Sequence, residues 1–378
     1  MAPHKQVVLL KSCVSNRGGL EKYASRIADC FLKKGCNVTL ITQGAAPVID
    51  SIRVFAAKTW SWPAFIRMEQ YDRFVNQWLN GNRADLIFGM DRNRMQTHLR
   101  AGNGVHAAFL QSRILTEGRL KWLICQANPL HRKILELEKD AFENPRLQKL
   151  FTNSHMVKRQ ILERYSTPSS KIEVVHNGVE WHEMQSGFDA WEMEKPLIAK
   201  RLGLDPFRFH FLFIGNGYLR KGLGQLLKAL ARLKSKDFTL SVVGKDTHWE
   251  EYRALADRLH LKDQVVFFGP QKETRPFYQM ADALVIPSFY DPFANVTIEA
   301  LAMGLFTISS KTNGGHEILT QNNGAVIEEL TDADALAATL ETAWMRPKTT
   351  ESARQIRESV RHLDFSHQMP FLIDASLC

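Results

Sequence analysis

"ALVIPSFYDPFANVTIEALAMGLFTISS", residues 283–310, contains a complete strand–helix–strand pattern. Apolar, β-branched residues predict a buried strand at 283–287 and a second one at 306–310. Asp291 lies in the loop after the first strand, and Glu299 follows eight positions later within a run typical of a helix. In such a unit, the loop and the first helical turn meet at the carboxyl end of the strand. The stretch therefore predicts a parallel α/β sheet with two carboxylates beside a crevice.

The same alternation extends along the chain. Further strands are predicted at 7–10, 38–42, 86–90, 149–151, 172–175, 211–215, 240–244 and 265–269. Amphipathic helical patterns separate them, as in "GLEKYASRIADCFLKKG" at 19–35. The series breaks in the polar, turn-rich stretch 176–196, which has no strand pattern. We therefore expect two doubly wound, Rossmann-like domains that face a central cleft.

Size and composition indicate a globular protein. A chain of 378 residues suits two domains of ordinary size. No apolar run approaches the roughly 20 residues that a membrane-spanning helix needs, and the first residues lack the pattern of a secretory signal. Five cysteines without a C-x-x-C motif argue against a disulfide framework or a zinc site. Together these features favour a reducing, cytoplasmic location.

Positive charge is concentrated in one stretch. Residues 53–133 hold 13 Lys or Arg against 5 Asp or Glu, in a chain whose net charge is +9. Such a region suits a nucleic acid, an anionic membrane surface or an acidic glycolipid. Within it, Phe65, Met68, Val75 and Trp78 recur at helical spacing. They indicate either a core-facing helix, which is the commoner case, or a helix that faces a membrane or glycolipid.

Glycine-rich loops offer sites for anions. "FLFIGNGYLRKGLGQLLKAL" (211–230) places Arg220 and Lys221 between a strand and a helix, where backbone N–H groups attract phosphate. Gly215 and Gly217 begin a dinucleotide fingerprint, but arginine replaces its third glycine and the later acid is missing. "GNGVHA" (102–107) also fits part of it, after a segment that we expect to be helical.

Two other motifs have simpler interpretations. Gly18 and Gly19 lie at a strand-to-helix turn, and they suit either an anion or an ordinary turn. The single D-x-D motif, Asp332 and Asp334, opens a helical pattern, and we predict a helix cap instead of a metal site.

These motifs, in this order, resemble the retaining nucleotide-sugar glycosyltransferases of family 4, whose two-domain fold is called GT-B. The family signature E-x7-E corresponds to "DPFANVTIE", accompanied by "RKG", "NGV" (177–179) and "GGHE" (314–317). Within the family the chain is most similar to the subgroup that adds the first glucose to the lipopolysaccharide core. The resemblance implies an acceptor-binding domain at 1–178, joined by a C-terminal helix at about 361–378, and a donor-binding domain at 179–360.

The resemblance also implies roles for individual residues. Glu299 would bind the ribose, and Arg220 and Lys221 would stabilise the leaving diphosphate without a metal ion. Asp291, which replaces the usual glutamate, would contact the sugar, and His106 is a further candidate near it. The remaining donor-binding residues would be Asn295, Val296, Thr297, Gly215, Gly18 and Gly19.

The function that follows is the transfer of a hexose to a lipopolysaccharide-core or other membrane-proximal glycan, with its anomeric configuration retained. The expected donor is UDP-glucose, without a cofactor or metal and without nucleic acid, and an anionic membrane at the cytoplasmic face is a further expected contact. A sugar-nucleotide epimerase of the same fold is the alternative. A basic nucleic-acid-binding protein is disfavoured because no base-reading module is evident, and a dinucleotide oxidoreductase because the ribose-binding acid is absent.

Overall fold

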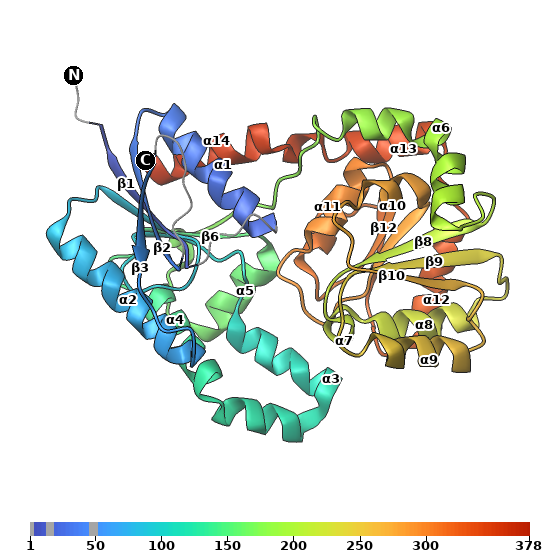
Figure 1. The fold of residues 1–378 in the computed structure, drawn as a ribbon, viewed down its shortest axis with the longest axis horizontal. Helices are drawn as coiled ribbons and strands as arrows, with labels where there is room; N and C mark the ends of the chain where they lie inside the picture. Colours follow the sequence, from blue (N-terminus) through green and yellow to red (C-terminus); the bar gives the residue numbers. More distant parts are fainter. Residues whose placement is uncertain (1–3, 13–18, 45–51) are drawn as a thin grey trace. The chain divides into compact units, whose positions relative to one another are not determined.

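The computed structural model describes residues 4–12, 19–44 and 52–378, and the chain forms two compact units. Unit 1 comprises Met1–His176 and Ser366–Cys378, and unit 2 comprises Asn177–Phe365. Each unit is built around one parallel sheet (Figure 1).

Unit 1 contains seven parallel strands in the order β3-β2-β1-β4-β5-β6-β7. The strands are β1 (Gln6–Leu10), β2 (Asn37–Gln43), β3 (Arg53–Ala57), β4 (Leu86–Gly89), β5 (His98–Arg100), β6 (Lys149–Thr152) and β7 (Ile172–Val174). The helices are α1 (Gly19–Lys33), α2 (Ala64–Gly81), α3 (His106–Ala127), α4 (Pro129–Phe142), α5 (His155–Arg164), the 3-10 turn η1 (Ser169–Lys171) and α14 (Phe365–Leu377). Strand order reverses between β1 and β4, which is the switch point of this sheet.

Helix α2 packs its apolar side against the unit 1 sheet. Tyr71 and Val75 are buried in one cluster with Val8 and Leu10 of β1, and Trp78 packs against that cluster. The apolar side chains predicted within residues 60–79 therefore face the core over this part of α2. This is the first of the two interpretations given for them.

The C-terminal helix α14 belongs to unit 1 from Ser366 onward and lies beside α1 (Figure 1). Lys34, just after α1, forms an ion pair of 2.5 Å with Asp374, and the Lys5 ammonium donates to the Leu377 carbonyl at 2.8 Å. These contacts hold the chain end against the beginning of the same unit. Across the described ranges, none of the helices combines the length and the hydropathy that crossing a membrane demands.

Unit 2 contains six parallel strands in the order β10-β9-β8-β11-β12-β13, with its switch point between β8 and β11. The strands are β8 (Phe209–Ile214), β9 (Phe238–Val243), β10 (Val265–Gly269), β11 (Ala283–Ile286), β12 (Phe306–Ser310) and β13 (Gly324–Ile327). The helices are α6 (Gln185–Leu202), α7 (Tyr218–Lys221), α8 (Leu223–Arg232), α9 (Trp249–Arg258), α10 (Arg275–Met280), α11 (Asn295–Ala302), α12 (Ala333–Trp344) and α13 (Thr350–Glu358), with 3-10 turns η2 (Gly314–Ile318) and η3 (Arg361–Leu363).

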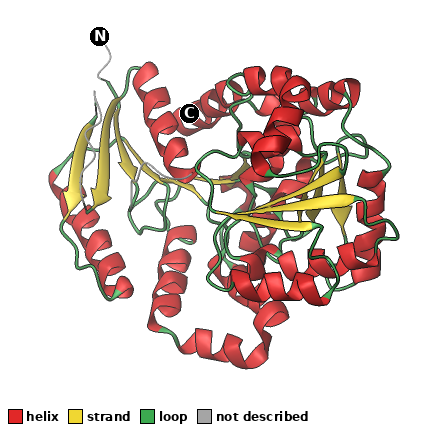
Figure 2. Ribbon diagram, turned by 45° about the vertical axis from the view of Figure 1, so that its right-hand side comes forward, coloured by secondary structure: helices red, strands yellow, loops and turns green. Residues whose placement is uncertain are grey.

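Both faces of the unit 2 sheet are buried. Alternate residues of β8 enter different clusters: Phe211 and Phe213 join one, and Leu212 and Ile214 join the other. Helices cover the two sides of the strands accordingly (Figure 2). Two-sided burial explains why these strands are continuous apolar runs in the sequence, which made them easy to predict.

Three strands were not predicted. β3 and β13 are edge strands of four or five residues, and β5 is a three-residue strand, His98–Arg100, whose outer members are polar although all three are buried. The expectation of a helical segment before "GNGVHA" was therefore wrong, because β5 precedes this loop and α3 follows it.

Candidate functional site

The predicted site residues of unit 2 gather at its switch point. β8 and β11 are paired neighbours, and the loops that follow them lead to α7 and α11 respectively. Gly222, at the end of α7, has φ 75°, and a Cβ at this position would lie 1.9 Å from the Pro287 carbonyl oxygen. Glycine is thus required for the close approach of the two loops.

Three charged side chains form a cluster at this point. Asp291 Oδ2 accepts hydrogen bonds from Lys221 Nζ at 2.7 Å and from Arg220 Nη1 at 2.9 Å. Asp291 and Lys221 are only 8% and 6% exposed. Burial raises the pKa of the Asp291 carboxyl, but the charges of Lys221 and Arg220 outweigh it, so the pKa lies below its usual value. Two cations thus share one carboxylate, and the cluster retains a surplus positive charge.

Backbone contacts hold both cations in place. The Lys221 stem runs over Gly215, where an added Cβ would lie 3.1 Å to 3.2 Å from three of its carbons. Arg220 Nη1 also donates to the Tyr290 carbonyl at 2.9 Å, and the Arg220 carbonyl accepts from the Phe289 N–H. Gly215, which the resemblance assigned to donor binding, therefore makes room for the lysine in this structure.

Helix α11 begins directly after the Asp291 loop. Asn295 and Val296 carry its first two N–H groups, and such groups have no acceptor within a helix. The N–H of Thr297 donates to the Ala294 carbonyl at 2.9 Å within the first turn. The helix start thus offers the N–H groups of Asn295 and Val296 for an anion.

A buried residue that the sequence analysis did not single out, Asn313, orders this region. Its Oδ1 accepts from the N–H groups of Ala294 and Gly315 at 3.0 Å and 3.1 Å, and its Nδ2 donates to Ser309 Oγ at 2.8 Å. The side chain therefore joins the end of β12, the start of α11 and the turn at Gly315. An asparagine that precedes two glycines is an ordinary turn signal, which is why its role went unnoticed.

The second carboxylate, Glu299, lies in a different environment from Asp291. Its Oε2 accepts a hydrogen bond of 2.7 Å from the Tyr278 hydroxyl. Burial, and then the charge of Glu299, raises the pKa of the Tyr278 hydroxyl well above its usual value, so that it remains a donor. Glu299 is half-buried, and its partner orients one oxygen. The two acids of the opening stretch thus hold different partners.

A cavity of about 460 Å³ opens next to α7 in unit 2. It lies at the carboxyl ends of β9 and β10 and is lined by Tyr218, Gly244, Lys245, Asp246, Trp249, Phe267, Phe268, Gly269 and Pro270. Asp246 Oδ2 accepts from the Tyr218 N–H at 2.6 Å and so ties the wall of the cavity to α7. Its size and mixed lining suit a flat, partly apolar group.

His106 is the first residue of α3 in unit 1. Its N–H donates to the buried Glu138 carboxylate at 2.7 Å, and its ring nitrogen Nε2 lies 3.1 Å from His131 Nδ1. Burial, and then the charge of Arg92, lowers the pKa of the His106 imidazole to about 4. The ring is therefore uncharged at neutral pH and suits hydrogen bonding instead of charge stabilisation.

Two predicted donor-binding residues lie outside the described residues or at their edge. Gly18 lies outside the described residues, and Gly19 is the first residue of α1. The D-x-D motif is the helix cap that we predicted: Asp332 accepts from the N–H groups of Asp334 and Ala335 at the start of α12.

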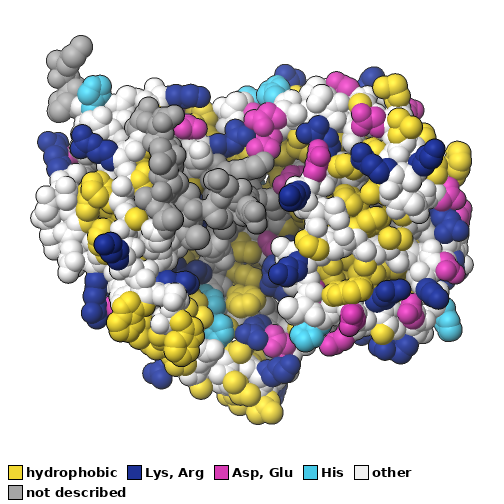
Figure 3. All heavy atoms as spheres, viewed as in Figure 1, with side chains coloured by type: hydrophobic (Ala, Val, Ile, Leu, Met, Phe, Trp, Pro, Cys, Tyr) yellow, Lys and Arg dark blue, Asp and Glu magenta, His cyan; other side chains and the backbone are white. Residues whose placement is uncertain are grey.

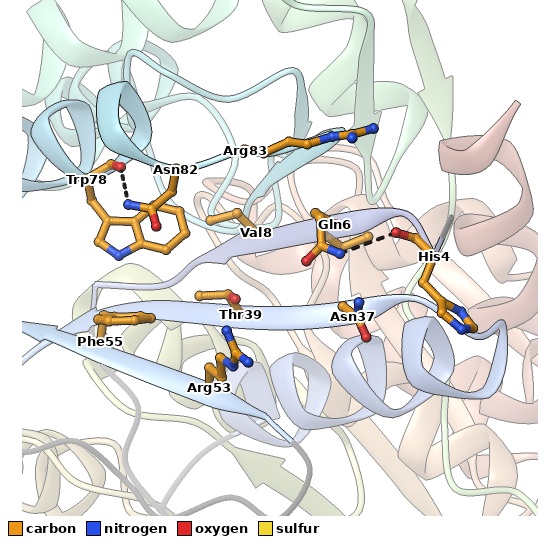
Figure 4. A pocket seen from close by; sticks show the side chains of 11 residues that line it. His4, Gln6, Val8, Asn37, Thr39, Arg53, Phe55, Trp78, Asn82 and Arg83 are labelled. Carbon is orange, nitrogen blue, oxygen red and sulfur yellow. Dashed lines mark hydrogen bonds between the residues drawn. The ribbon is translucent and has the colours of Figure 1, made fainter. Parts of the chain in front are cut away.

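A second hollow, of about 400 Å³, lies in unit 1 (Figure 4). It is lined by His4, Gln6, Val7, Val8, Asn37, Thr39, Arg53, Phe55, Trp78, Asn82 and Arg83. Gln6, Asn37 and Arg53 are the first residues of their strands, so this hollow lies at the amino ends of β1, β2 and β3. Sheets of this class bind ligands at the opposite ends of their strands, so this hollow lies away from the ligand-binding edge of the sheet.

Two units, each with a parallel α/β sheet and a central switch point, are the architecture of the GT-B fold. The crystal structure of WaaG, a glycosyltransferase involved in lipopolysaccharide biosynthesis, superposes with a TM-score of 0.77 at 21% identity and 98% coverage of both chains. Anabaena HepE in complex with UDP-glucose gives a TM-score of 0.70 at 16% identity, with 99% of both chains covered. These similarities show that the chain has the GT-B fold.

Sequence comparisons identify the family. The model "Glycosyltransferase Family 4" matches residues 17–182, and "Glycosyl transferases group 1" matches residues 194–362. A glycosyltransferase of Methanocaldococcus jannaschii is 26% identical over 318 residues, covering 80% of this chain and 79% of that protein. The lipopolysaccharide glucosyltransferase WaaG of Escherichia coli is 23% identical over 355 residues, covering 90% and 91%. The chain belongs to glycosyltransferase family 4 and is a glycosyltransferase.

Proposed function

We propose that this enzyme transfers a hexose from a UDP-hexose, with UDP-glucose the first candidate, to a hydroxyl of a lipopolysaccharide core or another membrane-proximal glycan. The anomeric configuration is retained, and no metal ion or cofactor takes part. Unit 2 binds the donor, unit 1 with α14 binds the acceptor, and the reaction takes place at the cytoplasmic face of a membrane.

One observation carries the proposal: the surplus positive charge of the Arg220–Lys221–Asp291 cluster beside the start of α11. A diphosphate brings two or more negative charges, and the cluster has two cations that share a single carboxylate. The N–H groups at the start of α11 add a partial positive charge. Cations fixed where charge develops are among the largest contributions to catalysis, and they would do the work that a divalent ion performs in other transferases.

The other residues suit the remaining parts of a nucleotide sugar. Glu299, oriented by Tyr278, is an acceptor for the two ribose hydroxyls. The cavity beside α7 has aromatic side chains and the space for a base. UDP is proposed because the similar protein HepE forms a complex with UDP-glucose, and glucose because WaaG is named a glucosyltransferase.

The chemical step follows from this arrangement. The acceptor oxygen forms a bond with the anomeric carbon on the face that the diphosphate leaves. The carbon–oxygen bond to the diphosphate breaks, its electron pair passes to the phosphate oxygen, and that oxygen takes the acceptor proton. Lys221 and Arg220 stabilise the charge on the departing diphosphate, Asp291 holds them and contacts sugar hydroxyls, and the neutral His106 donates to or accepts from the sugar.

A donor panel tests the proposal. Purified protein is incubated with UDP-, GDP- and ADP-glucose and with UDP-galactose, and release of the nucleoside diphosphate is followed with and without a lipopolysaccharide-core oligosaccharide. We expect release with UDP-glucose that the oligosaccharide accelerates and that a chelator leaves unchanged. Release of the nucleoside diphosphate only from GDP-glucose or ADP-glucose would overturn the assignment of UDP. Conversion of the donor into an epimer without an acceptor would favour the epimerase alternative.

A further inference from the structure

The hollow of unit 1 interrupts an otherwise apolar face of the sheet. Successive side chains of a strand point to opposite faces, and on the face that α2 covers, Val8, Leu10 and Ile41 are buried in one cluster. Closer to the strand starts, the same face carries four polar side chains that line the hollow: Gln6, Asn37, Thr39 and Arg53. Parallel sheets are normally apolar on both faces. This polar corner is therefore unusual for the fold and suits a polar ligand.

The chemical character of the hollow changes along the strands (Figure 4). Trp78 and Phe55 lie at one end, with ring centroids 5.3 Å apart and an angle of 56° between the planes. Arg53 lies in the middle and Asn37 towards the other end. Phe55 pairs with Ile41, four residues beyond Asn37 along β2, which corresponds to about 13 Å at about 3.3 Å per residue. An elongated ligand can thus contact aromatic, cationic and amide groups in turn.

One positive charge in the hollow is not neutralised. Arg83 forms an ion pair of 3.0 Å with Asp85, whereas Arg53 is exposed and has no carboxylate partner within the described ranges 4–12, 19–44 and 52–378. The described residues that line the hollow include no Asp or Glu. Basic and hydrophobic side chains also lie next to each other on this side of unit 1, near the amino end of β1 (Figure 3). A carboxylate or a phosphate would complement Arg53.

The other polar groups suit hydroxyls. The side chains of Gln6, Asn37 and Thr39 can each both donate and accept hydrogen bonds. The last turn of α2 adds backbone carbonyls that have no donor within the helix, of which the Trp78 carbonyl accepts from Asn82 Nδ2 at 2.7 Å. A bare anion cannot donate to such carbonyls and is repelled by this end of the helix. Hydroxyl groups can donate to them, so the ligand should carry hydroxyls as well as a negative charge.

The aromatic end favours a sugar ring over a nucleobase. Bases stack face to face on aromatic rings, and two rings hold a base between them when they are parallel. The rings of Phe55 and Trp78 are tilted instead. Phe55 is 39% exposed and Trp78 is half-buried, so together they present an open apolar surface. Such a surface suits the C–H groups on one side of a sugar ring.

We propose that this hollow is a second carbohydrate site, which binds an acidic saccharide. Arg53 pairs with a carboxylate or phosphate of the saccharide, Asn37 and Thr39 bond to its hydroxyls, and Phe55 and Trp78 contact one of its rings. The site holds the saccharide at the amino ends of β1, β2 and β3, away from the ligand-binding edge of the same sheet. It does not depend on which donor the enzyme uses.

Saturation-transfer NMR on the full chain tests this proposal with four probes: digalacturonate, glucose 6-phosphate, the neutral disaccharide cellobiose, and AMP. At least one acidic saccharide should bind about 10-fold more tightly than cellobiose, and which one binds distinguishes a carboxylate from a phosphate. Arg53→Gln should weaken the binding of the acidic saccharide about 10-fold and leave that of cellobiose within about 2-fold. Phe55→Ser should weaken the binding of both.

A matched control and a competition exclude trivial causes. Lys58→Gln, which changes an exposed lysine just after β3, should bind the probes like the wild type, and circular dichroism checks that every variant is folded. Excess UDP should leave the binding of the acidic saccharide unchanged. Displacement by UDP would place the saccharide at the donor site and overturn the proposal. So would tighter binding of AMP than of either acidic saccharide, or equal binding in the wild type, Arg53→Gln and Phe55→Ser.

Discussion

The two units have a switch point at the same place in their sheets, but the two points carry different charge. In unit 1, Lys11 at the end of β1 donates to both oxygens of Asp91, after β4, at 2.9 Å and 3.1 Å. The N–H and the hydroxyl of Ser12 also donate to Asp91, both at 2.7 Å. Among the described residues, one cation thus faces one carboxylate, and that carboxylate is well supplied with donors.

In unit 2 the equivalent place holds two cations and one carboxylate. Arg220 and Lys221 compete for Asp291 Oδ2, and the cluster lies at the start of a helix. Topology therefore determines where a ligand crevice forms, and charge balance determines what kind of ligand suits it. We expect the Lys11–Asp91 pair, which is balanced among the described residues of unit 1, mainly to stabilise the fold, whereas the unbalanced cluster of unit 2 suits a diphosphate.

The largest expected effect comes from removing the buried cation of unit 2. Lys221→Ala should lower kcat by about 100- to 1000-fold, as loss of one fixed donor to a developing charge does elsewhere. Steady-state kinetics with the preferred donor measures the change, and circular dichroism checks the fold. Lys228→Ala, which changes an exposed lysine on α8, is the matched control and should keep full activity. If both variants have wild-type kcat, Lys221 has no part in catalysis.

Asp291→Asn distinguishes the two roles proposed for the Asp291 carboxylate, which are to offset the two cations and to contact the sugar. Asparagine removes the negative charge that offsets Lys221 and Arg220, so UDP should bind as tightly as to the wild type or more tightly. Transfer should nevertheless fall by about 10- to 100-fold, because the charged contact that we propose between Asp291 and the sugar is lost. Calorimetry with UDP and kinetics with the sugar nucleotide measure the two quantities. Weaker UDP binding would mean that Asp291 acts chiefly by positioning the cations.

The sequence allowed much of this site to be predicted. Arg220, Lys221 and Asp291 follow strands with strong apolar patterns, so their place at the carboxyl edge follows from the alternation of strands and helices. Asn313 and Tyr278 were missed because their roles depend on hydrogen bonds between segments that are distant in sequence. β5 was missed because its outer residues are polar.

Asp91→Ala tests the unit 1 switch point. It leaves the Lys11 ammonium, which is buried, without its partner and should lower the free energy of unfolding by about 3 kcal/mol. UDP affinity should remain within about 3-fold of the wild type, a change below 1 kcal/mol. Urea unfolding and UDP titration together measure both effects. A loss of UDP binding as large as that of Lys221→Ala would show that the balanced pair also serves the nucleotide.

Tyr278→Phe should have a smaller effect. The variant removes the hydroxyl that donates to Glu299, and loss of one such hydrogen bond costs about 1 kcal/mol, or about 5-fold in UDP affinity. Tyr252→Phe, on α9, is the matched control and should bind UDP normally. An unchanged affinity in the Tyr278 variant would show that Glu299 needs no orienting partner.

A further effect is expected on the pH dependence of stability in unit 1. Because the pKa of His106 is lowered to about 4, the unfolded chain binds a proton at this residue below about pH 6.5 that the folded chain does not bind. His106 therefore makes stability fall as the pH drops from about 6.5 to about 4. His106→Asn should flatten this part of the profile, measured by thermal unfolding across the range. An identical slope would show that the imidazole titrates normally in the folded protein.

The central claim is that the unbalanced cluster of unit 2 binds a diphosphate, and titration of nucleoside diphosphates against their nucleosides tests it most directly. For the nucleotide that binds best, the diphosphate should bind at least about 100-fold more tightly than the nucleoside, and Lys221→Ala should remove most of this difference. Equal affinities for diphosphate and nucleoside, or a preference that Lys221→Ala leaves intact, would contradict the account.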